Sequence, residues 1–213
     1  MIDRGTCKTM LRESARLMLE HAERLSDIDS RFGDGDHGIT VTKIAKLVNE
    51  RIEAWDDASI KDFLDDLGMD VMAVRGGSAG PLYGTLIGGL GAQLGDDENE
   101  LSADAVRRMF AGCLAEMQDI TTAQVGDKTM VDALEPAVER MKSCAGTSDL
   151  GEMLSQAAEA AREGMEATKN YQAKYGRAKS LMERSVGFQD AGATSVWIII
   201  RSMREFVEQQ GSV

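Results

Sequence analysis

A chain of 213 residues, of which 43% are apolar, is long enough to bury a large core and favours one domain spanning residues 1–213. The formal net charge of −12 at pH 7 argues against nucleic acid or a membrane as partner, because phosphate groups are bound by clustered lysines and arginines. An acidic chain that handles phosphates would therefore need bound cations.

Cysteine usage and the N-terminal segment indicate the compartment. Cys7, Cys113 and Cys144 are odd in number and match no zinc-binding spacing, which predicts reduced thiols packed in the interior. The first residues contain no apolar signal-peptide core. We therefore expect a cytoplasmic protein.

Apolar residues recur with a helical period along most of the chain, and only two prolines interrupt it. A long first helix is predicted at about residues 5–28. Seven further helices are placed by their apolar stripes or capping residues at about 41–52, 60–71, 76–92, 102–114, 131–141, 150–171 and 196–207. No run of alternating residues predicts a strand. The expected fold class is all-α, with eight helices.

The uncharged segment 76–95 is long enough to cross a bilayer, but eight of its residues are glycine, so a membrane span is not expected. Gly76, Gly80, Gly84 and Gly88 are spaced by four and form a ridge without side chains on a helix. Such a ridge permits close approach of a ligand or of another helix. For the leading GGSAG a ligand-facing turn is favoured, and for the later glycines close helix packing is an equal alternative.

Three aspartates, Asp29, Asp34 and Asp36, crowd into the loop DIDSRFGDGDHG between the first two predicted helices. Clustered carboxylates suit a hard cation such as Mg²⁺ or Ca²⁺. An EF-hand is excluded because the twelfth position counted from Asp34 is Ala45 and not glutamate. The alternative is an ordinary turn whose side chains cap the next helix. The third aspartate and the neighbouring His37 favour the cation site.

No P-loop motif is present, so a phosphate would have to bind to free N–H groups at helix starts. Three segments rich in small residues precede predicted helices, at 37–40, 77–80 and 190–194. Each could simply cap its own helix. If they converge, they could hold a diphosphate that Mg²⁺ joins to the aspartates.

Charged side chains could assist this chemistry. Lys128, Arg177 and Arg184 could offset the charge of a transferred phosphate, and a surface or ion-paired role is the alternative for each. His37 could bind a phosphate or ribose oxygen, or take part in proton transfer.

Four segments, DIDSRFGDGDHG, GGSAGPLYGT, GDKTMVDALEPA and GRAKSLMERSVGFQDAGATS, resemble in order and spacing the ADP-binding L subunits of the dihydroxyacetone kinase family. The resemblance runs through most of the chain. It implies an all-α, eight-helix antiparallel barrel or bundle with the nucleotide site at one end.

The same resemblance implies a set of site residues. Asp29, Asp34 and Asp36 would bind two Mg²⁺ ions and, with His37, form the catalytic group. The residues expected to contact ADP or ATP are His37, Gly38, Ile39, Thr40, Ser78, Ala79, Met130, Arg177, Asp190, Ala191 and Gly192.

The implied activity is phosphoryl transfer to dihydroxyacetone, or to a related small ketose, held by a partner K subunit. Since the 213 residues include no K-type half, the chain looks like the separate-subunit form, in which a phosphohistidine carrier of the phosphotransferase system can be a further partner. Two alternatives remain. The chain could be a nucleotide-binding regulatory or sensor module that contacts a transcription factor or kinase, or a purely structural protein, which would leave the aspartates without a cation.

One segment departs from the family pattern. The usual GHxDPGA reads GFQDAGA, so Phe188 replaces a histidine and Ala191 replaces a proline. These departures leave the identity of the ketose open.

Overall fold

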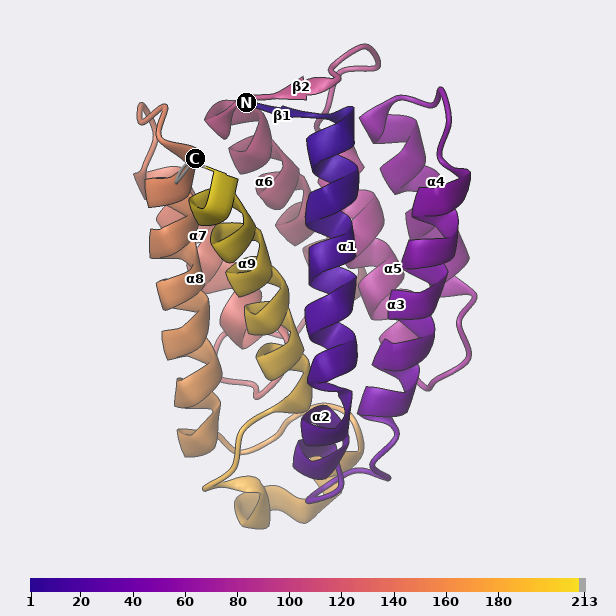
Figure 1. Cartoon of the computed structure of the whole chain (residues 1–213). Coiled ribbons are helices and arrows are strands. Elements are labelled where there is room, and N and C mark those ends of the chain that lie inside the picture. The colour runs from indigo at the N-terminus through magenta and orange to yellow at the C-terminus, as the bar shows by residue number, and fades with distance from the viewer. Residues whose placement is uncertain (211–213) are drawn as a thin grey trace.

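The structure is a computed structural model that describes residues 1–210, and it is almost entirely helical (Figure 1). The α-helices are α1 (Arg4–Glu20), α2 (Ala22–Asp29), α3 (His37–Ala54), α4 (Ile60–Met72), α5 (Ala79–Gly91), α6 (Ala103–Ile120), α7 (Val131–Ser143), α8 (Leu150–Ala167) and α9 (Ala191–Gln210). The shorter elements are β1 (Ile2–Asp3), β2 (Glu100–Leu101) and the 3₁₀ helices η1 (Thr168–Asn170) and η2 (Arg177–Ser185). The predicted all-α fold class is confirmed.

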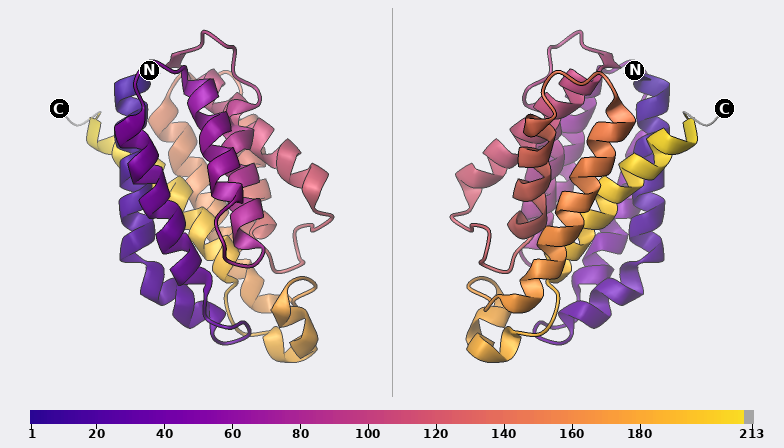
Figure 2. Two further views of the ribbon diagram at one scale, coloured as in Figure 1. Left: turned by 90° about the vertical axis from the view of Figure 1, so that its right-hand side faces the viewer. Right: turned by 90° about the vertical axis from the view of Figure 1, so that its left-hand side faces the viewer.

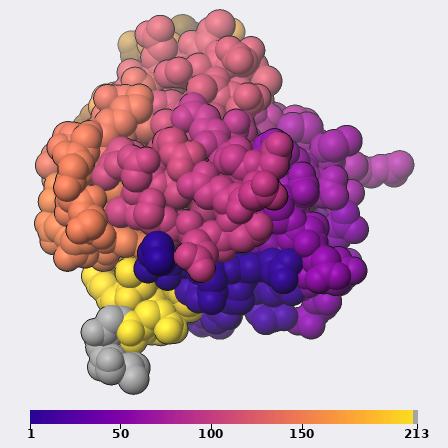
Figure 3. Space-filling model, turned by 90° about the horizontal axis from the view of Figure 1, so that it is seen from above, coloured from indigo at the N-terminus to yellow at the C-terminus, as the bar shows by residue number. Residues whose placement is uncertain are grey.

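The long helices form a closed ring. Contacts run from α1 to α3, then through α4, α5, α6, α7, α8 and α9, and α9 packs back on α1. Consecutive long helices run in opposite directions, so their connections gather at the two ends of the barrel (Figures 1 and 2). The loop between α2 and α3 and the segment that carries η2 lie together at one end. The N-terminal strand covers the other end beside residues 100–101 (Figure 3).

Two local differences from the predicted elements have physical reasons. The expected first helix is broken at His21, where φ is −94° and ψ is 2°, and α2 continues from Ala22. A Cβ atom at Gly38 would lie 1.8 Å from the Ala22 carbonyl oxygen, so the start of α3 contacts the backbone of α2. The strands β1 and β2 pair as Ile2 with Leu101 and Asp3 with Glu100, too short a ladder to show alternation.

Two helix ends also differ from prediction. The seventh predicted helix ends at Ala167 and continues as η1, instead of running to Tyr171. The last helix starts at Ala191 and not at residue 196. Its first turn consists of small residues, which show no apolar periodicity, so the sequence pattern did not predict it.

The core is continuous around the ring and consists mainly of Leu, Met, Val, Ile and Ala side chains. Cys7 and Cys113 belong to it as free thiols, and burial raises the pKa of both to about 12, which confirms the prediction of packed thiols for these two. Within residues 1–210, no helix has the length and hydropathy that crossing a membrane requires.

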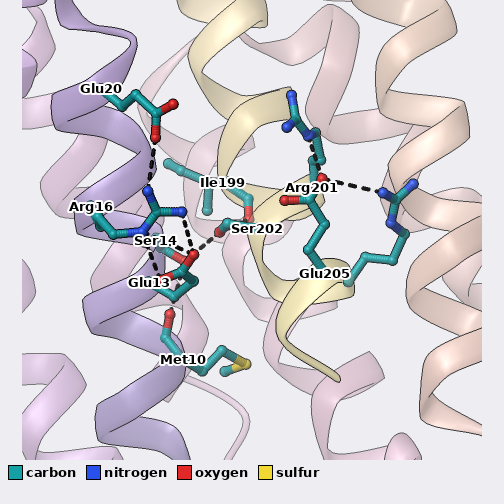
Figure 4. Close-up of polar contacts among 10 residues, drawn as sticks. Met10, Glu13, Ser14, Arg16, Glu20, Ile199, Arg201, Ser202 and Glu205 are labelled. Carbon is teal, nitrogen blue, oxygen red and sulfur yellow. Dashed lines mark hydrogen bonds and ion pairs between the residues drawn. The ribbon is translucent and has the colours of Figure 1, made fainter. Parts of the chain in front are cut away.

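One polar contact crosses the α1–α9 interface inside this core (Figure 4). The Ser14 and Ser202 hydroxyl oxygens lie 2.6 Å apart, and each is also within hydrogen-bonding distance of a carbonyl of its own helix. On the outer side of α1, Arg16 pairs with Glu13 and Glu20. Among residues 1–210 the interface is therefore apolar apart from this serine pair, and the charges of Arg16, Glu13 and Glu20 stay on the surface.

The glycines of α5 permit close helix packing on two sides. A Cβ atom at Gly84 would lie 2.6 Å from the Gly68 carbonyl oxygen of α4, and one at Gly89 would lie 2.7 Å from the Cys113 Cα of α6. Gly88 is different, because its nearest neighbour would be the Gly68 Cα at 3.9 Å. For these later glycines the structure shows helix packing.

We expect Gly89→Ala to lower the free energy of unfolding by about 1–3 kcal/mol, since the new methyl group meets the backbone of α6. Gly88→Ala is the matched control and should be neutral, or stabilising by up to about 1 kcal/mol, because alanine has the higher helix propensity. Urea unfolding followed by circular dichroism measures both. Equal effects of the two substitutions would contradict the packing argument.

Candidate functional site

The three aspartates of the loop between α2 and α3 come together. Asp29 is the last residue of α2, Asp34 lies in the loop, and Asp36 precedes α3. Each offers a carboxylate oxygen, and these three oxygens lie within 4.8 Å of one another. The loop turns tightly, since the Gly33 N–H donates to the Asp29 carbonyl at 2.6 Å and Gly35 has a φ of +73°.

The negative charge of this cluster is compensated only in part by the described residues. The Asp29 Oδ2 atom is buried and has no hydrogen-bond partner among the described residues. Asp34 is exposed and forms an ion pair with the guanidinium of Arg177 from η2. A buried carboxylate oxygen without a partner is costly, and a divalent cation held by oxygen ligands would remove the cost. The residues present therefore fit a hard cation.

His37 begins α3 beside the cluster and is held by a polar chain. Its Nε2 atom lies 3.1 Å from the Ser195 hydroxyl, which also contacts the Tyr83 hydroxyl and the Ala191 and Gly192 carbonyls. Burial lowers the pKa of His37, while Asp29 acts in the opposite direction, so the imidazole is neutral at pH 7. Sequence reasoning missed Ser195 and Tyr83.

The starts of α3 and α5 lack a side-chain cap, whereas the first N–H group of α7, that of Val131, donates to the Thr129 hydroxyl at 3.2 Å. Among the described residues, the capping positions Asp36 of α3 and Ser78 of α5 make no side-chain hydrogen bond to the first turn. The helices α1, α4, α6 and α8, which start at the other end of the barrel, are all capped by side chains (Figure 1). Free N–H groups therefore gather at the end that carries the aspartates, which is where an anion would bind.

The structure brings the predicted contact segments together in pairs. A Cβ atom at Gly76 would lie 2.1 Å from the Thr40 Oγ1 atom, so the turn before Ser78 and Ala79 rests on the first turn of α3. A Cβ atom at Gly192 would lie 3.3 Å from that of Met130, which joins the starts of α7 and α9. Ile39 is exposed and Gly38 is buried.

The start of α9 differs because a carboxylate occupies it. The Ala193 N–H donates to Asp190 Oδ2 at 2.7 Å, so Asp190 caps the helix. Burial, with smaller contributions from Asp132 and Asp29, raises the pKa of Asp190 to about 7. The segment 190–192 thus lies at the site, with its first turn capped by its own aspartate.

Two buried residues organise the loop before α7: Asp132, which sequence reasoning missed, and Lys128, which the sequence placed among the candidate cations for a transferred phosphate. Asp132 is fully buried and accepts hydrogen bonds from the Gly126 and Thr129 N–H groups at 2.6 Å each. Lys128 is also buried, with a φ of +62°, and donates to the Thr168 and Phe188 carbonyls. Burial lowers the pKa of Lys128. Its ammonium group thus ties two loops together, whereas Arg177 is the cation at the cluster.

The comparison with protein families matches residues 31–205 to the DAK2 domain. The chain belongs to the DAK2 domain family. A similar protein is the "PEP-dependent dihydroxyacetone kinase 2, ADP-binding subunit DhaL" of Listeria innocua, at 32% identity over 92% of this chain and 91% of the relative. The "D-erythrulose kinase" of Mycolicibacterium smegmatis is 33% identical over 91% of this chain, which corresponds to 34% of the relative.

Solved structures share this fold. The native dihydroxyacetone kinase of C. freundii aligns with a TM-score of 0.71 at 23% identity, over 93% of this chain and 34% of that one. Its complex with AMP-PNP and Mg²⁺ aligns with a TM-score of 0.69 at 21% identity. The DAK2 chain is thus similar to dihydroxyacetone kinase subunits along its whole barrel.

We expect Asp190→Asn to change the pH dependence of stability. The folded-state pKa of Asp190 lies above the unfolded value, so the wild type loses stability as the pH rises from about 4 to 7. Asparagine keeps the acceptor for the Ala193 N–H and cannot ionise. Urea unfolding between pH 4 and pH 8, with chelator present, should therefore show the variant gaining stability relative to the wild type as the pH rises. If the free energy of unfolding of the variant and of the wild type changed in parallel with pH, the raised pKa of Asp190 would be wrong.

Proposed function

We propose that the chain, residues 1–213, acts as one L-type domain that binds Mg-ADP or Mg-ATP and transfers a phosphoryl group to dihydroxyacetone or a related small ketose. The observation that carries the proposal is the convergence of three carboxylates, one with an unpartnered buried oxygen, beside helix starts without side-chain caps. The similarity to ADP-binding kinase subunits supports it.

The proposed cation ligands are Asp29, Asp34 and Asp36, which together would hold two Mg²⁺ ions. Bound Mg²⁺ neutralises phosphate charge during transfer, and phosphoryl transfer needs positioning and charge neutralisation more than covalent chemistry. The AMP-PNP and Mg²⁺ complex of the C. freundii kinase supports this pairing of nucleotide and metal.

The nucleotide would lie against the helix starts. The first turns of α3 and α5 offer N–H groups to the phosphates through residues 37–40, Ser78 and Ala79. Met130 and the turn at 190–192 would contact the base. Neutral His37, fixed by Ser195, would donate to or accept from a phosphate or ribose oxygen without adding charge.

Arg177 would exchange partners when the site fills. Its guanidinium now compensates Asp34, and a cation bound there would free it for the phosphates. Arginine is suited to this role because its fork of N–H donors matches phosphate oxygens.

The ketose would be held by a partner K subunit, since the described site supplies nucleotide contacts and cation ligands only. A phosphohistidine carrier of the phosphotransferase system is the proposed phosphoryl donor, which the term "PEP-dependent" in the name of the Listeria relative supports. The similarity to D-erythrulose kinase supports a four-carbon ketose as an alternative to dihydroxyacetone.

We expect Asp34→Asn to abolish Mg²⁺-dependent ADP binding and phosphoryl transfer while leaving the fold intact, because Asp34 is exposed and its loss opens no cavity. Asp27→Asn is the control, since Asp27 is an exposed carboxylate of α2 outside the cluster. Calorimetric titration of ADP with and without Mg²⁺ should show at least a tenfold loss of affinity for Asp34→Asn alone. If wild-type affinity is the same with and without Mg²⁺, the cation proposal is wrong.

A reconstituted assay separates catalysis from a regulatory role. The purified chain, a K subunit and a phosphoryl donor are mixed with dihydroxyacetone or erythrulose, and ketose phosphate is measured. Product that depends on Asp34 supports transfer. ADP binding without product from either ketose would favour the nucleotide-sensing alternative.

A further inference from the structure

A second recess lies on the outer face of α2. It has a volume of about 270 Å³ and lies between α2 with the loop that follows it, η1 and the segment before α9. Its lining residues are Arg24, Asp27, Ile28, Arg31, Lys169, Gly187, Phe188 and Gln189. None of these is a proposed nucleotide contact or cation ligand, so the recess is separate from the site described above.

The charge of this recess is opposite to that of the protein. Three basic side chains and one acidic side chain line it, in a chain whose net charge is −12. Arg24 and Arg31 form no ion pair with any carboxylate of residues 1–210, whereas Lys169 pairs with Glu166. Two arginines thus line the same recess, and neither is part of an ion pair among the described residues.

An aromatic side chain forms one wall. The Phe188 ring packs edge-on against Phe32 at a centroid distance of 5.0 Å, and the Arg31 guanidinium lies 5.8 Å from the Phe188 ring. Stacking of this kind leaves the guanidinium N–H groups free to bind an anion. Together with Ile28, Phe188 gives the recess an apolar surface beside its cations.

Hydrogen bonds to the backbone and to Gln189 hold the segment 187–189, which forms this wall, in place. The buried Lys128 ammonium donates to the Phe188 and Thr168 carbonyls, and the Gly187 N–H donates to the Lys169 carbonyl at 2.7 Å. Gln189 is held by Glu166 at 2.7 Å. The shape of the wall is therefore set before any ligand arrives, which lowers the entropic cost of binding.

We propose that this recess binds a small organic phosphate monoester, with the phosphate between Arg24 and Arg31 and the carbon skeleton against Phe188 and Ile28. A dianionic phosphate can accept hydrogen bonds from both arginine forks at once, which a monocarboxylate cannot do to the same extent. A volume of about 270 Å³ suits a ligand of a few carbon atoms better than a nucleotide.

The test uses the full chain with chelator and without nucleotide, so that no cation can hold phosphate at the aspartates. Glycerol 3-phosphate, inorganic phosphate and acetate are titrated while the amide resonances of Gly187 and Gln189 are followed by NMR. Saturable shifts are expected with the ester, weaker ones with inorganic phosphate and none with acetate. Absence of saturation by the ester, or equal binding of acetate, would overturn the proposal.

Matched variants locate the binding. Arg31→Gln and Arg24→Gln should each raise the Kd of the ester at least tenfold, and Phe188→Ala should remove its advantage over inorganic phosphate. Arg12→Gln is the control, because Arg12 is an exposed arginine of α1 that pairs with Glu53, and it should leave the Kd unchanged. Circular dichroism checks that each variant is folded.

A peptide of six glutamates serves as a competitor. If it binds more tightly than the ester and depends on Arg24 and Arg31, the recess takes an acidic protein segment and the small-ligand proposal is wrong. If Asp34→Asn leaves ester binding intact, the recess works independently of the nucleotide site. Loss of ester binding in Asp34→Asn would place the ester at the aspartates and overturn the assignment.

Discussion

Repulsion among the carboxylates of Asp29, Asp34 and Asp36 is the constraint on which the site end of this barrel depends. Their oxygens lie within 4.8 Å of one another, and one oxygen of Asp29 is buried without a partner among the described residues. Like charges at this distance repel one another, and a positive charge placed between them offsets the repulsion. Arg177 supplies part of that positive charge through its ion pair with Asp34. A cation that binds the remaining carboxylates would remove the rest of the repulsion and so stabilise the folded state.

The antiparallel arrangement of the helices places helix N-termini, which can bind a phosphate, beside this acidic cluster. Because alternate helices start at the same end, the starts of α3, α5, α7 and α9 all gather near the aspartates. The starts of α3 and α5 carry no side-chain cap among the described residues, while the helices that start at the far end are capped by Asp3, Ser59, Ser102 and Asp149. The contact of Gly76 with Thr40 places the turn before α5 on the first turn of α3, so that the free N–H groups of these two helix starts can act together.

The sequence predicted the periodic part of the structure and the acidic cluster, since both depend on residues close together in the chain. Contacts between distant segments could not be predicted in this way. The His37–Ser195 bond joins residues 158 positions apart, and the Lys128 ammonium binds carbonyls, which leave no signature in the side chains. The break at His21 could not be predicted either, because no proline or glycine stands there. It coincides with the close contact between Ala22 and Gly38, two residues that lie far apart in the sequence.

Phe188, which departs from the family pattern, lies between the acidic loop and the basic recess. Its carbonyl is held by Lys128, its ring packs against Phe32 of the acidic loop, and its outer face lines the basic recess. A histidine at this position would bring a polar ring to the same contact with Phe32 and Arg31. The Phe188 ring therefore links the acidic loop to the recess through an aromatic and a cation–π contact, with the Arg31 guanidinium 5.8 Å from its centroid, while the Asp34 carboxylate pairs with Arg177.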